Sequence, residues 1–189
     1  MEDNRIKSAL EIALEKAAQM PSLTHEELVK QKEREFKPRG EAIANKYMGN
    51  ALRGADLVTE LRRYKGEEGE TVKKAFLSTL FESIRLNDVE KSRRAISGIQ
   101  TVEKEVSLKE IDRELEEVFN EYRQEEKQRA LVYEGLEREQ LQKLGISGSA
   151  VKPNLEESKN WQQELAGLKL IYESRLNKLK ENIAHLIRI

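Results

Sequence analysis

The fold is decided by two stretches of sequence: residues 108–144, LKEIDRELEEVFNEYRQEEKQRALVYEGLEREQLQKL, and residues 154–189, NLEESKNWQQELAGLKLIYESRLNKLKENIAHLIRI. Both carry apolar side chains at steps of three and four, the spacing of an amphipathic helix. The breakers between them are Gly145, Gly148 and Pro153. The pattern predicts two long helices folded back on each other, a rod on the order of 50 Å long.

The apolar positions of this predicted hairpin are spaced as in a coiled coil. The first helix has a heptad seam made of Leu108, Ile111, Leu115, Val118 and Tyr122, and resumes an apolar face at Ala130, Tyr133, Leu136, Leu141 and Leu144. The second helix has a stripe made of Trp161, Leu165, Leu168, Tyr172, Leu176, Leu179, Ile183 and Leu186. A polar gap at 123–129 and one stutter in the second stripe interrupt the heptads.

Charge supports the same pairing independently. Residues 108–121 are strongly acidic, and folding the chain back at about residue 149 sets them opposite the basic residues of the last helix, which are Arg175, Lys178, Lys180 and Arg188. Opposite charges beside a seam select the partner and its orientation. Each exposed pair contributes only roughly 0.2–1 kcal/mol, so burial of the leucines must hold the rod together.

The N-terminal half shows shorter helical patterns. We expect helices at 3–20, 24–37, 39–48, 55–65, 70–86 and 88–105, with Pro21 and Pro38 ending the first two and a turn at 66–69. The segment 70–86 is apolar on more than one side, which predicts the buried centre of a bundle. The phase of the apolar stripe changes near 105–107, so we place a break there. Because neither a proline nor a glycine pair lies between 88–105 and 108–144, one continuous helix is the alternative.

The predicted fold class is therefore all-α. We expect an N-terminal helical bundle over 1–105, followed by a long antiparallel coiled-coil helical hairpin over 107–189 with its tip at 145–153. Charged residues make up 37% of the chain and aromatic residues 5%. This balance suits thin cores and an elongated molecule.

Composition also narrows the function classes. The 34 basic and 35 acidic residues nearly cancel, which argues against broad, non-specific nucleic-acid binding. The chain has no cysteine, so disulfides and zinc–thiolate sites are excluded. It has no basic, apolar signal-peptide pattern at Met1–Asp3 and no apolar run of the ~20 residues that cross a bilayer. We expect a cytoplasmic protein that does not enter a membrane.

No catalytic constellation stands out. The two histidines, His25 and His185, are far apart, and the Glu-x-x-His pairs of helical di-metal sites are absent. The parts of nucleophile–base catalysis and the glycine-rich phosphate loop are missing too. We therefore expect a protein that is not an enzyme and that uses no metal and no cofactor.

The segment at the predicted hairpin tip has an unusual composition: Gly145, Ile146, Ser147, Gly148, Ser149, Val151 and Pro153 are the residues of interest. A helical hairpin needs only about 2–5 connecting residues, fewer than this chain supplies. Three interpretations stay open: a plain connector, a docking tip for a protein, and a backbone-amide nest for an anion.

Two short basic clusters offer a further site. Arg62, Arg63 and Lys65 form the first, and Lys91, Arg93 and Arg94 form the second. Both are flanked by acidic residues and lack an aromatic platform. They suit solvated helix faces, or alternatively a local patch for nucleic-acid phosphates.

Our leading functional expectation is a non-enzymatic adaptor or assembly protein that binds a protein partner through the exposed hairpin. The alternative is a nucleic-acid or ribonucleoprotein accessory factor that uses the basic clusters. A third hypothesis is a homo-oligomer, in which Trp161, Tyr172 and the apolar end at 187–189 are buried between copies.

Overall fold

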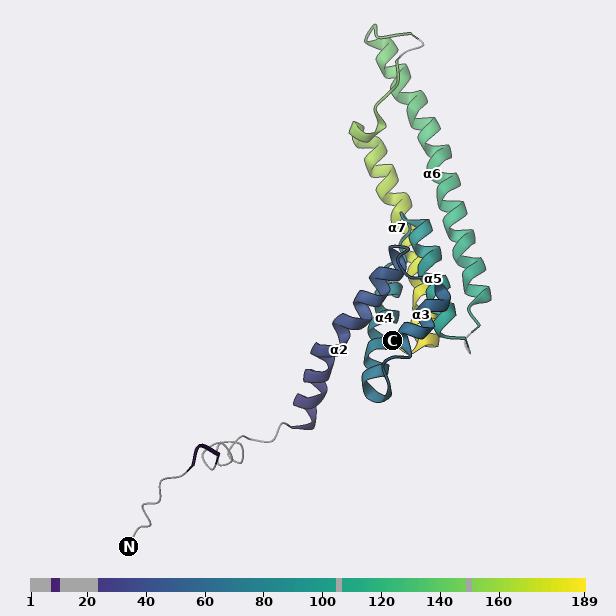
Figure 1. Ribbon diagram of the computed structural model, residues 1–189. Coiled ribbons are helices and arrows are strands. Elements are labelled where there is room, and N and C mark those ends of the chain that lie inside the picture. The colour runs from purple at the N-terminus through teal and green to yellow at the C-terminus, as the bar shows by residue number, and fades with distance from the viewer. Residues whose placement is uncertain (1–7, 11–23, 105–106, 149–150) are drawn as a thin grey trace.

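A computed structural model describes residues 8–10, 24–104, 107–148 and 151–189 (Figure 1). Throughout these residues the chain is all-helical and contains no strand, so the predicted all-α class is confirmed. The elements are α2 (His25–Met48), α3 (Gly54–Leu61), α4 (Gly66–Glu82), α5 (Val89–Val102), α6 (Lys109–Lys143), the short 3-10 helix η1 (Leu155–Glu157) and α7 (Lys159–Ile187). The expected helix at 3–20 falls mostly outside the described residues.

Helix α4 lies at the centre of the packing, as its all-round apolar sequence predicts. It contacts α2, α3, α5 and α7. Its buried residues are Val72, Ala75, Phe76, Leu77 and Leu80. Gly40 on α2 allows the closest approach, because a Cβ at this position would meet the Val72 carbonyl and lie 2.8 Å from the Cβ of Ala75.

The prediction that Pro38 ends a helix is wrong, because α2 runs through it without a break. Proline removes one backbone donor and leaves the carbonyl four residues earlier without its usual partner. Here that carbonyl belongs to Arg34, and both Arg34 and Pro38 are exposed, so water can satisfy it. Burial of Phe36 and Ile43 on either side of the proline stabilises the continuous helix.

The expected turn at 66–69 is also wrong, since Gly66 is the first residue of α4. Gly66 adopts a φ of +60°, in the left-handed region that favours glycine. Glu67 and Glu68 then occupy the first helical turn, where acidic side chains interact favourably with the helix dipole. The glycines therefore allow a tight entry into the helix.

Helices α5 and α6 are separate, with α5 ending at Val102 and α6 beginning at Lys109. Residues 105 and 106, where the break was predicted, lie outside the described part of the chain. A single apolar core nevertheless runs from Phe36 on α2 to Ile187 on α7. The division into modules at 1–105 and 107–189 stays a prediction.

Helices α6 and α7 pack along the predicted stripes. The rings of Tyr122 and Tyr172 lie 5.6 Å apart, as do those of Tyr133 and Trp161. As the residue number rises along α6, the number of the partner on α7 falls. Of the expected charge pairs, Arg175 and Glu121 form one at 2.5 Å.

The apolar stripes were predicted incorrectly at their ends. Leu136 and Leu144 on α6 are exposed, and so is Leu186 on α7. Ile187 is buried in place of Leu186, and Phe119, which the heptad pattern skipped, is fully buried. Phe119 and Ile187 both belong to the core that helices α2 to α7 share, so the heptad pattern of two helices alone does not identify them.

Candidate functional site

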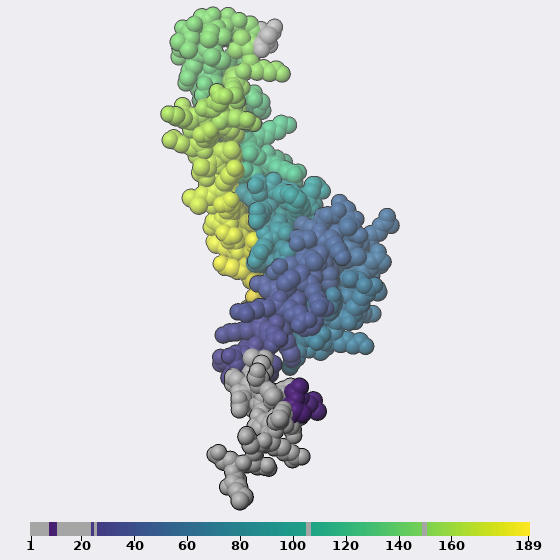
Figure 2. All heavy atoms as spheres, turned by 60° about the vertical axis from the view of Figure 1, so that its left-hand side comes forward, coloured from purple at the N-terminus to yellow at the C-terminus, as the bar shows by residue number. Residues whose placement is uncertain are grey.

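The distal α6–α7 segment, which we define as the described residues of 130–171 (130–148 and 151–171), extends away from the other helices (Figures 1 and 2). Large aliphatic side chains are exposed on both helices of this segment and in the connection between them: Leu131, Val132 and Leu136 on α6, Leu144 and Ile146 after its end, and Leu170 and Ile171 on α7. Val132 is 62% exposed and Leu170 is 71% exposed. Val132 and Leu136 are one turn apart, so they lie on the same side of α6.

The polar gap at 123–129 is where the two helices exchange polar contacts. Arg129 binds the Glu125 carboxylate at 3.0 Å on its own helix and the Glu164 carboxylate on α7. The phenol of Tyr133 donates a hydrogen bond of 3.3 Å to Glu164. The hydrogen bond to Glu164 is the main cause that raises the pKa of Arg129. The gap therefore joins the two helices through hydrogen bonds and ion pairs.

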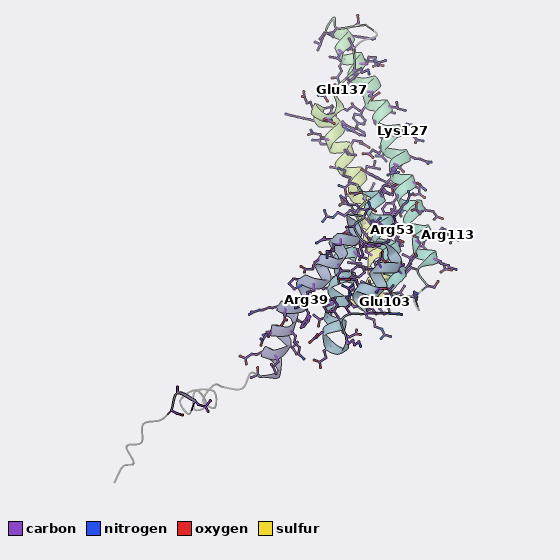
Figure 3. All side chains as sticks on the ribbon, viewed as in Figure 1. Arg39, Arg53, Glu103, Arg113, Lys127 and Glu137 are labelled. Carbon is purple, nitrogen blue, oxygen red and sulfur yellow. The ribbon has the colours of Figure 1, made fainter. Side chains whose placement is uncertain are left out.

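A further polar contact lies closer to the tip. The hydroxyl of Ser158 donates a hydrogen bond of 2.6 Å to Glu137. The same hydroxyl accepts from the backbone N–H of Trp161 and so caps α7. Figure 3 places Glu137 and Lys127 on the part of α6 that only α7 accompanies. The segment is thus held by the Tyr133–Trp161 ring contact, the buried Leu168 and a few polar pairs, with its outer faces open to solvent.

The predicted tip residues are placed as follows. Gly145 has a φ of +80°, its N–H donates to Gln142, and the N–H of Ile146 donates to Leu141 at 2.9 Å, which is a Schellman helix end. Gly148 has a φ of +141°. The side chains of Ile146 and Ser147 are exposed, while Val151 and Pro153 are half-buried. Ser149 lies outside the described residues.

Asn154 caps a helix after the tip, but not α7. Its side chain accepts from the N–H of Glu156 at 3.2 Å and caps the short η1 instead. Helix α7 begins five residues later, at Lys159. The connection between α6 and α7 is therefore longer than the few residues that a helical hairpin needs. The exposed Ile146 lies at its start.

The first basic cluster lies at the end of α3. Arg63 pairs with Glu60 at 2.7 Å. Arg62 lines a cavity of ≈ 450 Å³ together with Tyr64. Lys65 precedes α4 as its N-cap residue and is exposed. These three cations do not converge on a single groove.

The second basic cluster is engaged within the fold. Arg93 forms two hydrogen bonds of 2.5 Å to the Glu116 carboxylate, which lower the pKa of Glu116 and raise that of Arg93. Arg94 donates from Nε to the Tyr47 carbonyl at 2.5 Å and lies 4.7 Å over the Tyr47 ring. Lys91 pairs with Asp88 at 2.8 Å. Arg93 and Arg94 therefore join helices to one another.

The residues proposed for self-association already pack against other residues of the same chain. Trp161 and Tyr172 are buried between α6 and α7, and Ile187 is buried in the core. Arg188 adopts a left-handed φ of +55° and ends α7. Little of their apolar surface is left for a second copy.

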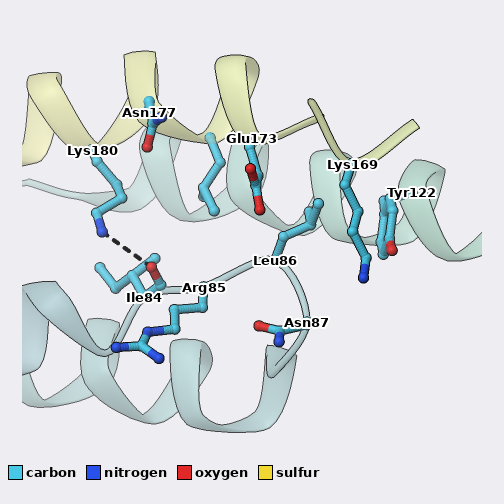
Figure 4. Close-up of a pocket in the computed structure, with 10 residues that line it drawn as sticks. Ile84, Arg85, Leu86, Asn87, Tyr122, Lys169, Glu173, Asn177 and Lys180 are labelled. Carbon is cyan, nitrogen blue, oxygen red and sulfur yellow. Dashed lines mark hydrogen bonds between the residues drawn. The ribbon is translucent and has the colours of Figure 1, made fainter. Parts of the chain in front are cut away.

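Sequence reasoning missed a cavity of ≈ 370 Å³ between α7, α6 and the α4–α5 connection (Figure 4). Its polar lining includes Arg85, Asn87, Lys169, Glu173, Asn177 and Lys180. These residues come from segments more than 80 positions apart, and no local spacing connects them. The sequence pattern had placed Lys180 opposite the acidic residues of 108–121, and no local signal indicated that it meets the α4–α5 connection instead.

Among the residues with described side chains, no group of three or more histidine, aspartate or glutamate residues is arranged to hold a metal ion. Within the same part of the chain, no helix combines the length and apolarity needed to cross a membrane. Comparison of the chain with protein-family models, with curated proteins and with solved structures found no match.

Proposed function

We propose that this chain is a non-enzymatic adaptor or assembly protein, and that it binds a protein partner through the distal α6–α7 segment. In this proposal α6 and α7 form an antiparallel coiled-coil hairpin, which the opposite order of their paired residues supports. The observation that carries the proposal is the exposure of large aliphatic side chains where only two helices pack, above all Val132 and Leu136.

The energetic argument concerns the outer face of α6. Burial of apolar surface contributes about 25 cal/mol per Å², and two helices alone leave Val132 and Leu136 without cover. Charged residues flank them on the same helix, among them Glu134, Arg138 and Glu139. An apolar centre with a charged rim is the usual composition of a protein interface. The partner we infer is a protein that presents an apolar ridge to this side of α6.

The test is capture of partners by the full-length tagged chain, with three double variants compared against the wild type. Val132→Asp with Leu136→Asp changes the side of α6, and Ile146→Asp with Val151→Asp changes the tip. Leu28→Asp with Val29→Asp is the matched control, because both residues are exposed aliphatics on α2. Circular dichroism and thermal unfolding confirm that each variant is folded before capture.

A partner that the wild type and the α2 control retain, and that either distal variant loses, supports the proposal. The variant that loses the partner also tells whether the side of α6 or the tip makes the contact. Recovery of the same proteins by all four chains contradicts binding through the distal segment.

The two other hypotheses have simple tests. A gel shift at low ionic strength that shows salt-sensitive binding to RNA or DNA would favour a nucleic-acid accessory factor, although Arg93 and Arg94 already have partners within the chain. Light scattering that gives more than one chain per particle would favour self-association. A monomer that binds no nucleic acid leaves the adaptor proposal as the one to pursue.

A further inference from the structure

The cavity between α7 and the α4–α5 connection contains three cationic side chains that come from two separate parts of the chain. Arg85 follows α4, while Lys169 and Lys180 lie on α7 three turns apart. Figure 4 shows Lys180 and Lys169 extending from α7 toward the connection, with Glu173 between them. Across residues 24–104, 107–148 and 151–189, none of the three cations forms an ion pair.

Lys180 is the most constrained of these cations. It is half-buried, donates a hydrogen bond of 3.1 Å to the backbone carbonyl of Ile84, and lies 4.7 Å from the centre of the Phe81 ring. Burial lowers its pKa, and the positive charge of Arg85 lowers it further. Two cations therefore approach each other in a partly desolvated place, and among the described residues a neutral carbonyl is the only hydrogen-bond acceptor of Lys180.

The remaining polar lining suits an anion. Asn87 and Asn177 bring amide groups that can donate hydrogen bonds. Glu173 is the one acidic residue in the lining, and Glu82 on α4 adds a second negative charge near Lys180, so three positive charges face two negative ones. An anion in the cavity would neutralise the excess, and its attraction to both side chains would offset the repulsion between Arg85 and Lys180.

We propose that this cavity binds a phosphate-type oxyanion, with Lys180, Arg85 and Lys169 as its cationic ligands. The guanidinium of Arg85 matches the geometry of two phosphate oxygens, and the lysines act as point charges. The cavity of ≈ 370 Å³ has room for more than one phosphate group, so the ligand class is a pyrophosphate or a small phosphorylated molecule. This site does not depend on the adaptor proposal, because it lies outside residues 130–171 except for Lys169.

The experiment is a titration of the full chain with sodium pyrophosphate at low ionic strength. Binding is measured by calorimetry and by NMR of the lysine side chains. Sodium phosphate forms a second arm, and sodium chloride at matched ionic strength controls for screening. The variants are Arg85→Gln, Lys169→Gln and Lys180→Gln. Lys178→Gln is the matched control, because it removes the same charge from an exposed position on α7 outside the cavity.

We expect saturable binding of pyrophosphate by the wild type, with the NMR signals of Lys180 and Lys169 shifted. Each cavity variant should weaken binding by at least about tenfold, which corresponds to about 1.4 kcal/mol. The Lys178→Gln control should bind as the wild type does. If pyrophosphate binds more strongly than phosphate, the ligand carries more than one phosphate group. If the two bind equally, the cavity recognises a single phosphate group.

Two results would overturn the proposal. One is the absence of any saturable shift with either anion at millimolar concentration, and the other is an equal loss of affinity in Lys178→Gln and the cavity variants. Lys180→Arg guards against a folding artefact, because it keeps the charge and should retain most of the binding if the charge is what matters. A folded Lys180→Gln chain that still binds with wild-type affinity would equally contradict the assignment.

Discussion

The phenol of Tyr172 on α7 donates a hydrogen bond of 3.1 Å to the carboxylate of Glu125 on α6, inside the polar gap that interrupts the apolar seam. The ring of Tyr172 is buried, whereas Glu125 remains partly exposed. The seam is therefore held across its weakest stretch by a buried phenol bonded to a partly solvated charge.

Tyr172→Phe should lower the free energy of unfolding by roughly 1.5–3 kcal/mol, because a hydrogen bond to a charged group is lost while the ring stays in place. Urea unfolding followed by circular dichroism measures the change. Tyr64→Phe is the control, since no hydrogen bond of the Tyr64 hydroxyl is formed within the described residues. A control that loses as much as Tyr172→Phe would show that the Glu125 contact contributes nothing specific.

Gly40→Ala should destabilise the chain by roughly 1–3 kcal/mol, because the added Cβ would meet the backbone of α4 and force the two helices apart. Gly135→Ala on α6 is the matched substitution, since a Cβ there meets nothing within 4 Å. It should stabilise the chain by up to about 1 kcal/mol through helix propensity. Thermal melts of both variants give the comparison, and a neutral Gly40→Ala would contradict the close packing of α2 on α4.

Arg94→Ala should lower the free energy of unfolding by roughly 1.5–3 kcal/mol, because it leaves the Tyr47 carbonyl without its charged donor and uncovers the Tyr47 ring. Arg63→Ala removes the same charge from an exposed pair and should change stability by less than about 0.5 kcal/mol. If denaturant unfolding shows equally small effects for Arg94→Ala and Arg63→Ala, Arg94 contributes no more to stability than an exposed surface cation.

The stability of the chain should fall as the pH rises from about 10 to about 12. Burial raises the pKa of Tyr122 from 10.0 to about 12, and the negative charge of Glu126 adds to the effect. The unfolded chain loses this proton near pH 10 while the folded chain still holds it, so the unfolded state binds fewer protons and is favoured as the pH increases.

The matched measurement for that pH dependence is Tyr122→Phe. The variant has no phenol to titrate, so its free energy of unfolding should decline less steeply than that of the wild type over the same pH range. The ring contact with Tyr172 is retained, which limits the change at neutral pH. Parallel curves for the two chains would show that Tyr122 ionises near its ordinary pKa.

Leu168→Ala and Leu170→Ala should differ sharply although they are two residues apart on α7. Leu168 is fully buried, and its truncation should destabilise the chain by roughly 2–5 kcal/mol. Leu170 is largely exposed, so its truncation should leave stability within about 0.5 kcal/mol. Similar losses at both positions would mean that the face of α7 directed toward α6 is wrongly assigned.

The all-α class and the long helices were predictable because their signals are local. Steps of three and four between apolar residues fix a helical face, and Gly145 ends α6 as its sequence position suggested. The same local rules failed at Pro38 and at 66–69. At Pro38, burial of Phe36 and Ile43 on either side outweighs the preference of a single proline, whereas at 66–69 the left-handed Gly66 lets the chain enter α4 directly.

The candidate sites were less predictable, because they depend on which residues meet across the fold. Nothing near Arg94 in the sequence shows that it bonds to the carbonyl of Tyr47. Likewise, Arg85 and Lys180 are brought together only when α7 packs beside the end of α4. The sequence alone does not distinguish a free basic side chain from one that forms an ion pair or lines a cavity.

Helix α7 is one unbroken rod of 29 residues, about 44 Å at 1.5 Å per residue. Trp161 packs near one end of it and Ile183 is buried near the other. A pulling force applied at the distal end would be transmitted along this helix. It would act on the packing of Ile183 against the other helices. Tension applied to the distal end would therefore change how readily the central helices unfold.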